Sequence, residues 1–234
     1  MDTHPGHVDG PRPPTASPAE AWAALLEGNQ RFVAGEMEHP SQGADRRAEV
    51  SVDQHPFAVL FGCSDSRVAA EIIFDRGLGD MFVVRTAGHV VDTTVIGSIE
   101  YGVDLLGAPL VVVLGHDNCG AVGAASRAVM TGEMPSGFVR AIVDRVIPSI
   151  VTRSVIQPGT APGAPVRSDG DGYALSIPGP DELRREHVRA TVRMLQAYSA
   201  SLADAVTNGR CAIVGVEYTL ADGRVNVVEA IGEI

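Results

Sequence analysis

The chain of 234 residues contains no lysine, so all eighteen of its basic residues are arginines. Without lysine the protein cannot form a Schiff base with a carbonyl substrate, and it cannot supply the lysine of a phosphate-binding P-loop. Twenty-nine acidic residues give a formal net charge of −11. This excess argues against nucleic acid and anionic membranes as partners, because both attract a positively charged surface.

Long apolar runs are missing as well. No stretch approaches the ~20 consecutive apolar residues of a membrane-spanning helix. The first residues show no basic stretch followed by an apolar block, so we expect no signal peptide and a cytoplasmic location. Residues 1–16 are rich in proline, glycine and histidine without periodicity, which predicts a flexible N-terminal arm. We expect residues 17–234 to form a single domain.

Cysteine is scarce: the chain has Cys63, Cys119 and Cys211, and no Cys-x-x-Cys pair. An odd count in a protein expected in the cytoplasm argues against a disulfide framework, and the missing pair argues against a thiol-redox protein. Cys63 and Cys119 follow apolar stretches that end in glycine, whereas Cys211 opens such a stretch. We therefore expect Cys211 to be a core residue.

Short apolar stretches alternate with helical patterns along the chain. Strands are predicted at 57–62, 81–85, 110–114, 212–218 and 225–228. Helices are predicted at 17–35, 68–74, 93–106, 119–130, 137–151 and 181–206. Ser17 and Glu20 form a capping box at the start of the first helix, with Pro18 at its first position.

This alternation predicts an α/β fold with a mostly parallel sheet covered by helices. Asp222-Gly223 predicts a hairpin that adds an antiparallel edge strand at the C-terminal end. Residues 155–180 are rich in proline and glycine and predict a long loop or insert.

Metal-type ligands follow two of the predicted strands. Cys63 ends the first strand, and His116 and Cys119 lie three residues apart after the third. Two thiolates and an imidazole suit zinc, and three protein ligands leave one tetrahedral position open, as in catalytic zinc sites. A structural zinc site would need a fourth ligand, for which Cys211 is the remaining thiol.

Asp65 and Arg67 follow Cys63 at two-residue intervals. A carboxylate in this place can coordinate the metal or orient a water molecule on it, and the arginine can hold that carboxylate in a bidentate ion pair. A zinc-bound water with a pKa lowered to ~7 would be a hydroxide nucleophile at neutral pH. The alternative is an ordinary surface ion pair that caps the helix expected at Val68.

The pattern Cys63-x-Asp65-x-Arg67 with His116-x-x-Cys119 resembles the β-class carbonic anhydrases, or carbonate dehydratases. The resemblance implies a mostly parallel α/β fold, a homodimer or a dimer of dimers, and zinc at each active site. It also implies the reversible hydration of carbon dioxide to bicarbonate and a proton, by zinc-bound hydroxide attack assisted by an Asp–Arg dyad.

The resemblance assigns roles to residues of this sequence. It makes Cys63, His116 and Cys119 the zinc ligands, with Asp65 and Arg67 as the catalytic dyad. The substrate-binding residues implied are Gln54, Phe82, Tyr101 and Gly120, with Gln54 supplied by the neighbouring subunit. Without that role, the two aromatic residues are plain core and the glutamine is a loop residue.

Two departures from the family pattern lie at residues 86–89 and at residues 155–180, a proline- and glycine-rich stretch without a recognised counterpart in the family. Thr86-Ala87-Gly88-His89 replaces an asparagine-rich segment, and His89 either relays protons or, as we favour, makes a structural hydrogen bond. Some relatives close the site with the aspartate as fourth zinc ligand, which here would be Asp65. Their tryptophan three residues before the first ligand is Leu60 in this chain, so we favour an open site.

Three function classes follow. The first is a zinc hydro-lyase acting on carbon dioxide, and the second is a hydrolase of carbonyl sulfide or carbon disulfide on the same fold. The third is a non-catalytic protein stabilised by zinc. Asp65, Arg67 and Gln54 argue against the third class, because a non-catalytic relative would be free to lose them.

Overall fold

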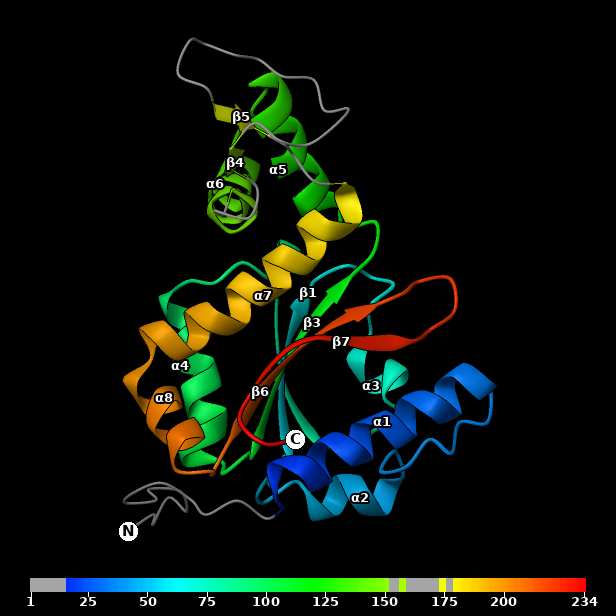
Figure 1. The fold of residues 1–234 in the computed structure, drawn as a ribbon. Coiled ribbons are helices and arrows are strands. Elements are labelled where there is room, and N and C mark those ends of the chain that lie inside the picture. The colour runs from blue at the N-terminus through cyan, green and yellow to red at the C-terminus, as the bar shows by residue number, and fades with distance from the viewer. Residues whose placement is uncertain (1–15, 152–155, 159–172, 176–178) are drawn as a thin grey trace.

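The computed structural model describes residues 16–151, 156–158, 173–175 and 179–234, and its centre is a five-stranded sheet (Figure 1). The strands are β1 Ala58–Cys63, β2 Met81–Thr86, β3 Leu110–His116, β6 Ala212–Tyr218 and β7 Val225–Ile231. Their order is β2-β1-β3-β6-β7. The first four pair in parallel and β7 pairs antiparallel with β6. The predicted fold class, with its antiparallel C-terminal edge strand, is confirmed.

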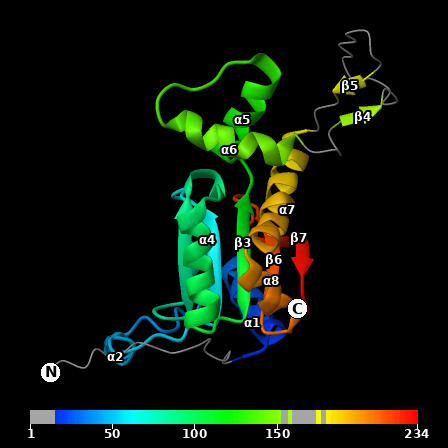
Figure 2. The same cartoon turned by 90° about the vertical axis from the view of Figure 1, so that its left-hand side faces the viewer.

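Helices cover both faces of this sheet. They are α1 Pro18–Ala34, α2 Ala44–Glu49, α3 Ala70–Ile73, α4 Thr93–Glu100, α5 Gly120–Thr131, α6 Val139–Ile150, α7 Pro180–Tyr198 and α8 Ala200–Thr207. One face packs on α1 and α3, and the other packs on α4, α7 and α8. Helices α5 and α6 form a third cluster beyond the carboxyl end of β3 (Figure 2). No helix among the described residues is long and apolar enough to cross a membrane.

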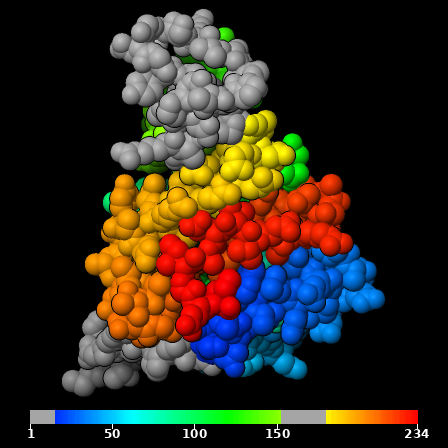
Figure 3. Space-filling view, in the orientation of Figure 1, coloured from blue at the N-terminus to red at the C-terminus, as the bar shows by residue number. Residues whose placement is uncertain are grey.

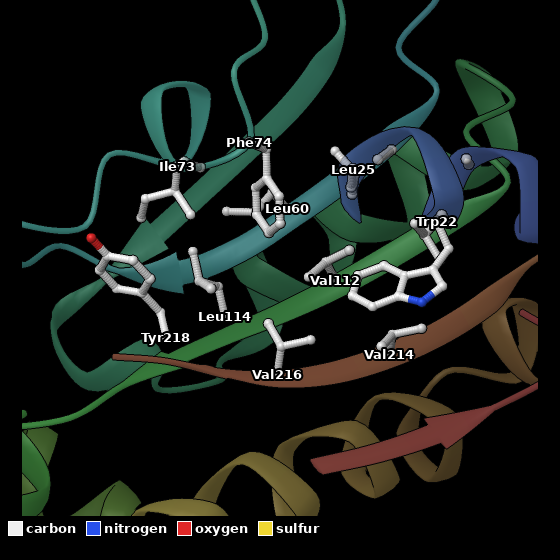
Figure 4. Close-up of a cluster of buried hydrophobic side chains, with 14 of the residues drawn as sticks. Trp22, Leu25, Leu60, Ile73, Phe74, Val112, Leu114, Val214, Val216 and Tyr218 are labelled. Carbon is white, nitrogen blue, oxygen red and sulfur yellow. The ribbon is translucent and has the colours of Figure 1, made fainter. Parts of the chain in front are cut away.

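β1 and β3 are buried along their whole length, as expected for central strands of a doubly covered sheet. Leu60, Val112 and Leu114 pack into the cluster beneath α1 and α3 (Figure 4). Phe61 and Val113 alternate with them and pack into the opposite cluster. Burial of each such side chain stabilises the folded state by about 1.5–3 kcal/mol. Packing on both faces of the sheet therefore holds the ends of β1 and β3 in place.

Helix α1 begins and ends where the sequence predicts. Ser17 accepts a hydrogen bond from the backbone of Glu20, and the Glu20 carboxylate accepts one from the backbone of Ser17. The helix ends at Gly35, whose φ of 72° lies in the left-handed region that favours glycine. On the surface, β7 lies between α7 and α1 (Figure 3).

Two predicted helices differ from the structure. The helix predicted at 181–206 is divided into α7 and α8 by Ser199, whose extended backbone and hydroxyl cap the start of α8. The helix predicted at 93–106 continues from α4 into a π-helical turn, Tyr101–Leu105. Glu100, the last residue of α4, accepts a hydrogen bond from Ser199 at 2.5 Å, so the two irregularities contact each other.

Residues 155–180 were predicted to be a loop or insert, but they contain two short strands, β4 Ile156–Pro158 and β5 Tyr173–Leu175. These two strands pair antiparallel. The high proline and glycine content of the segment did not predict this pairing. The rest of this segment up to residue 178, and the predicted arm up to residue 15, lie outside the described residues.

Asp75 joins α1, the loop after it and the end of α3. Its buried carboxylate accepts hydrogen bonds from Arg31 Nε at 2.6 Å and from the backbone N–H groups of Glu38 and His39 at 3.0 Å. Burial alone would raise the pKa of this carboxyl, but the hydrogen bonds outweigh it and leave the pKa below its usual value.

Asp75→Asn is therefore expected to lower the free energy of unfolding by about 2 kcal/mol at neutral pH, because it leaves Arg31 without its charged partner. A carboxyl with a depressed folded-state pKa stabilises above its unfolded pKa of about 3.9 and loses that effect as the pH falls through the folded value. The difference between the two proteins in urea unfolding should therefore shrink toward acid. Asp144→Asn, which removes an exposed partner of Arg140, is the control and should cost under about 1 kcal/mol. Equal losses in both variants would contradict this role for Asp75.

Candidate metal centre

The parallel pairing of β1 with β3 brings the three proposed ligands together. Gly62 pairs with Leu114, which places Cys63 and His116 at neighbouring strand ends. Asn118, with a φ of 52°, then turns the chain so that Cys119 directly precedes α5. The two sulfur atoms and a ring nitrogen of His116 all lie within 4.8 Å of one another, and all three residues are buried.

The orientation of His116 leaves one nitrogen for a metal. Its Nδ1 lies 2.7 Å from the carbonyl oxygen of Asp117. A carbonyl only accepts, so Nδ1 carries a proton, and in the neutral ring, which is the form that binds a metal, Nε2 keeps its lone pair. Among the described residues, Nε2 has no hydrogen-bond partner although it is buried. A buried lone pair beside two sulfur atoms is a donor set that fits zinc.

The charges within the cluster favour a thiolate. Sharing a proton with Cys119 lowers the pKa of the Cys63 thiol, and the same contact raises the pKa of Cys119. Burial alone would lower the pKa of His116, but its contact with the Cys63 sulfur outweighs this and raises it. Cys63 also accepts a hydrogen bond from the Gly88 N–H, with 3.2 Å between nitrogen and sulfur. Deprotonated sulfur is the form that binds a metal.

Asp65 is held by Arg67 beside these ligands. Arg67 donates from Nε to Oδ1 at 2.9 Å and from the second guanidinium nitrogen to Oδ2 at 2.7 Å. These hydrogen bonds hold the pKa of the Asp65 carboxyl well below its usual range. Oδ2 also lies 3.9 Å from His116 Nε2. The carboxylate is thus charged, fixed, and next to the position where the donor set would hold a metal.

The proposed pocket residues lie in different surroundings. The rings of Phe82 and Tyr101 have centroids 5.8 Å apart and are inclined by 33°. Tyr101 is 44% exposed, which argues against a purely core role. Gly120 begins α5 with open space where a side chain would be. Gln54 lies in the exposed loop before β1, and its role stays a prediction because it was assigned to a neighbouring subunit.

Cys211 does not belong to the cluster. It precedes Ala212, which pairs with Leu110 at the opposite end of β3 from His116. Its side chain is buried in the apolar cluster under α7 and α8, as the sequence predicted. The alternative of a structural zinc site with Cys211 as fourth ligand is therefore wrong.

The predicted hydrogen bond of His89 is also absent. The ring is buried, and within the described part of the chain neither of its nitrogens has a hydrogen-bond partner. It stacks on His187, with ring centroids 4.2 Å apart, and burial lowers its pKa well below the usual value. An uncharged, enclosed ring does not favour a proton relay.

Sequence reasoning missed two contacts at this centre. Arg85 donates to the backbone carbonyl oxygens of Cys63 and Asp65, at 3.0 and 2.7 Å, and so supports the turn that carries both. The Gly88 hydrogen bond to Cys63 was missed as well. Its signal in the sequence was a glycine in the turn two residues after the end of β2, where the chain adopts a positive φ.

Three comparisons with known proteins agree with one another. A family model described as "Carbonic anhydrase" matches residues 58–225. "Carbonic anhydrase 2" of Mycobacterium tuberculosis strain H37Rv is 51% identical over 221 residues, which is 94% of this chain and 98% of the relative.

Solved structures share the fold at lower identity. A β-carbonic anhydrase of Coccomyxa in complex with acetazolamide is similar with a TM-score of 0.62 and 22% identity, over 93% of this chain and 89% of that one. One of two tetrameric β-carbonic anhydrases of Sordaria macrospora has a TM-score of 0.62 and 18% identity, over 89% of this chain and 96% of that one. At these identities the likeness is one of fold alone.

If Cys119 is a ligand, Cys119→Ser should lower the metal content from about one zinc ion per chain to a small fraction of that, because one of two thiolates is lost. Elemental analysis of the purified proteins by mass spectrometry measures this. Cys211→Ser, which also removes a buried thiol, is the matched control and should keep its zinc. Full zinc content in Cys119→Ser would exclude Cys119 from the ligand set.

Proposed function

The chain belongs to the β-class carbonic anhydrase family, and we propose on that basis that it catalyses the zinc-dependent reversible hydration of carbon dioxide to bicarbonate and a proton. The observation that carries this proposal is the position of Asp65: a carboxylate held by Arg67, 3.9 Å from the Nε2 of His116. A reaction at the metal can use a charged carboxylate fixed in that position. A metal site that only stabilises the fold would not need one.

In this proposal Cys63, His116 and Cys119 hold the zinc ion. A bound zinc supplies Lewis acidity, which lowers the pKa of a coordinated water to ~7. The buried His116 Nε2, which has no partner among the described residues, and the two buried sulfur atoms support the assignment. They would offer three neutral or anionic donors to the ion in a small space.

Asp65 acts as a fixed hydrogen-bond acceptor in this proposal. Three hydrogen bonds from Arg67, one of them from its backbone N–H, occupy both oxygens of the carboxylate. This supports an open resting state in which Asp65 rests on Arg67 and is not the fourth ligand. From there the carboxylate can accept a hydrogen bond from a water molecule at the site. This would orient a lone pair of that water toward the substrate.

Carbon dioxide has no net charge or dipole, so it needs an apolar pocket. The contacting rings of Phe82 and Tyr101 support such a wall. Gly120 at the start of α5 leaves room beside Cys119. We assign Gln54 to the site of a second copy, which requires a homodimer or a dimer of dimers like the tetrameric relatives in Sordaria. A cytoplasmic location stays part of this proposal.

Asp65→Asn is expected to lower kcat for carbon dioxide hydration by about 100-fold, because the amide cannot keep the charged pairing with Arg67 that fixes its acceptor oxygen. Stopped-flow hydration at neutral and alkaline pH, with zinc analysis of the same samples, measures this. Asp144→Asn, which breaks a surface Asp–Arg pair on α6, should keep the wild-type rate.

One result would contradict the proposed activity, and another would contradict only the proposed mechanism. Stoichiometric zinc in the wild-type protein with no hydration at any alkaline pH would exclude the activity. Hydration by Asp65→Asn at the wild-type rate would remove the Asp–Arg dyad from the mechanism and leave the activity standing.

A further inference from the structure

A buried histidine far from the ligands in sequence is connected to one of them through a single residue. His187 of α7 is 3% exposed, yet both of its ring nitrogens have partners. Nε2 lies 2.7 Å from the carbonyl oxygen of Gly88, and Nδ1 lies 2.5 Å from the hydroxyl of Ser149 in α6. Because a carbonyl only accepts, Nε2 must carry the proton and donate it to Gly88.

Gly88 also touches the metal cluster. Its N–H donates to Cys63 Sγ at 3.2 Å, so its two polar backbone groups join His187 to a proposed ligand. Its φ of 66° lies in the left-handed region, and a Cβ there would approach within 2.5 Å of the Cβ of Ala121 in α5. Only glycine fits, and glycine has the greatest backbone freedom. A hydrogen bond from outside this segment, such as the one from His187, can therefore restrict the orientation of the peptide groups on either side of Gly88.

We propose that His187 is a positioning residue for the metal centre: by holding the Gly88 carbonyl, it aims the Gly88 N–H at the sulfur of Cys63. This inference rests on the proposed zinc enzyme and adds to it a role for three groups outside the ligand set, His187, Ser149 and Gly88. Ser149 lies at the other nitrogen of the ring: its hydroxyl oxygen is 2.5 Å from Nδ1 and 2.6 Å from the carbonyl oxygen of Val146, so its one proton is shared between two acceptors while the contact limits rotation of the ring.

The aimed N–H has a defined chemical effect. A hydrogen bond to a thiolate withdraws electron density from sulfur, which weakens its donation to the metal and stabilises the charge on a buried atom. Without the bond, Cys63 donates more electron density, but the charge on its buried sulfur is less stabilised and the sulfur is less well oriented, and we expect these two losses to weaken metal binding. Partners of this kind commonly affect metal affinity by 10–100-fold when they are removed.

His187 also packs against its neighbours. The ring stacks on His89, and it lies in the contact of α6 with α7, so its loss would create a packing defect in any case. The test therefore needs a readout at the sulfur itself. Cobalt(II) bound in place of zinc gives a thiolate-to-cobalt charge-transfer absorption whose energy depends on the electron density of the sulfur.

The central variant is His187→Phe, which keeps a ring and removes both hydrogen bonds. We expect its charge-transfer band to move to longer wavelength and its zinc dissociation constant, from competition with a chelating dye, to rise about tenfold. His187→Gln, whose amide can still donate to Gly88, should recover the wild-type band. Ser149→Ala, which leaves the ring in place but loosened, should give a smaller shift in the same direction, and serves if His187→Phe does not fold.

Val192→Ala is the matched control. Val192 is a fully buried residue of α7 that packs against the sheet beside Gly215. We expect it to lower the melting temperature while the band and the zinc affinity stay at wild-type values. If the charge-transfer band of Val192→Ala shifted as far as that of His187→Phe, general destabilisation would explain the shift, and the inference would be overturned.

The outcomes separate the inference from the function on which it rests. A wild-type protein that binds neither cobalt nor zinc would overturn the proposed function. A wild-type protein that binds metal and hydrates carbon dioxide, with an unmoved band in both His187→Phe and Ser149→Ala, would overturn the inference alone. A band that fails to recover in His187→Gln would also count against it, because the donated N–H would then not be what matters.

Discussion

The parallel pairing of β1 with β3 is the constraint on which the rest of the structure depends. Both strands are buried on both faces, so their register cannot slip without exposing an apolar face to water. That register sets Cys63 beside His116, and the turn after β3 adds Cys119. Two sulfur atoms and an imidazole nitrogen are thus held together by the hydrophobic core, before any metal contributes to the stability of the cluster.

Hydrogen bonds around the ligands fix the protonation and the direction of each group. Asp117 fixes the proton of His116 on Nδ1, Arg67 fixes the carboxylate of Asp65, and Gly88 donates to Cys63. Buried polar atoms left without partners are costly, and within the described residues His116 Nε2 is such an atom. The cost is offset when a metal accepts its lone pair, which explains why the core retains it.

The sequence predicted the parts of this centre that depend on local pattern. The strand ends, the α1 cap and the hairpin after β6 follow from apolar periodicity and turn residues within short windows. The proposed ligands Cys63, His116 and Cys119 follow from their places after two strand ends and from the spacing of the last two. The missed features depend on contacts between distant residues. His187 lies 99 positions from Gly88, and the break at Ser199 involves Glu100, which is 99 positions away. No local pattern in the sequence encodes such pairs. For His89 the sequence suggested a structural hydrogen bond, but in the folded protein its ring stacks on His187 instead.

The most direct measurement is a crystal structure of the purified protein with anomalous diffraction recorded at the zinc absorption edge. We predict a zinc ion bonded to Cys63 Sγ, His116 Nε2 and Cys119 Sγ, at about 2.3 Å from sulfur and about 2.0–2.1 Å from nitrogen, with Asp65 still paired with Arg67. An anomalous peak elsewhere in the molecule, or an ion bound there without His116, would contradict the zinc site on which the proposed function depends.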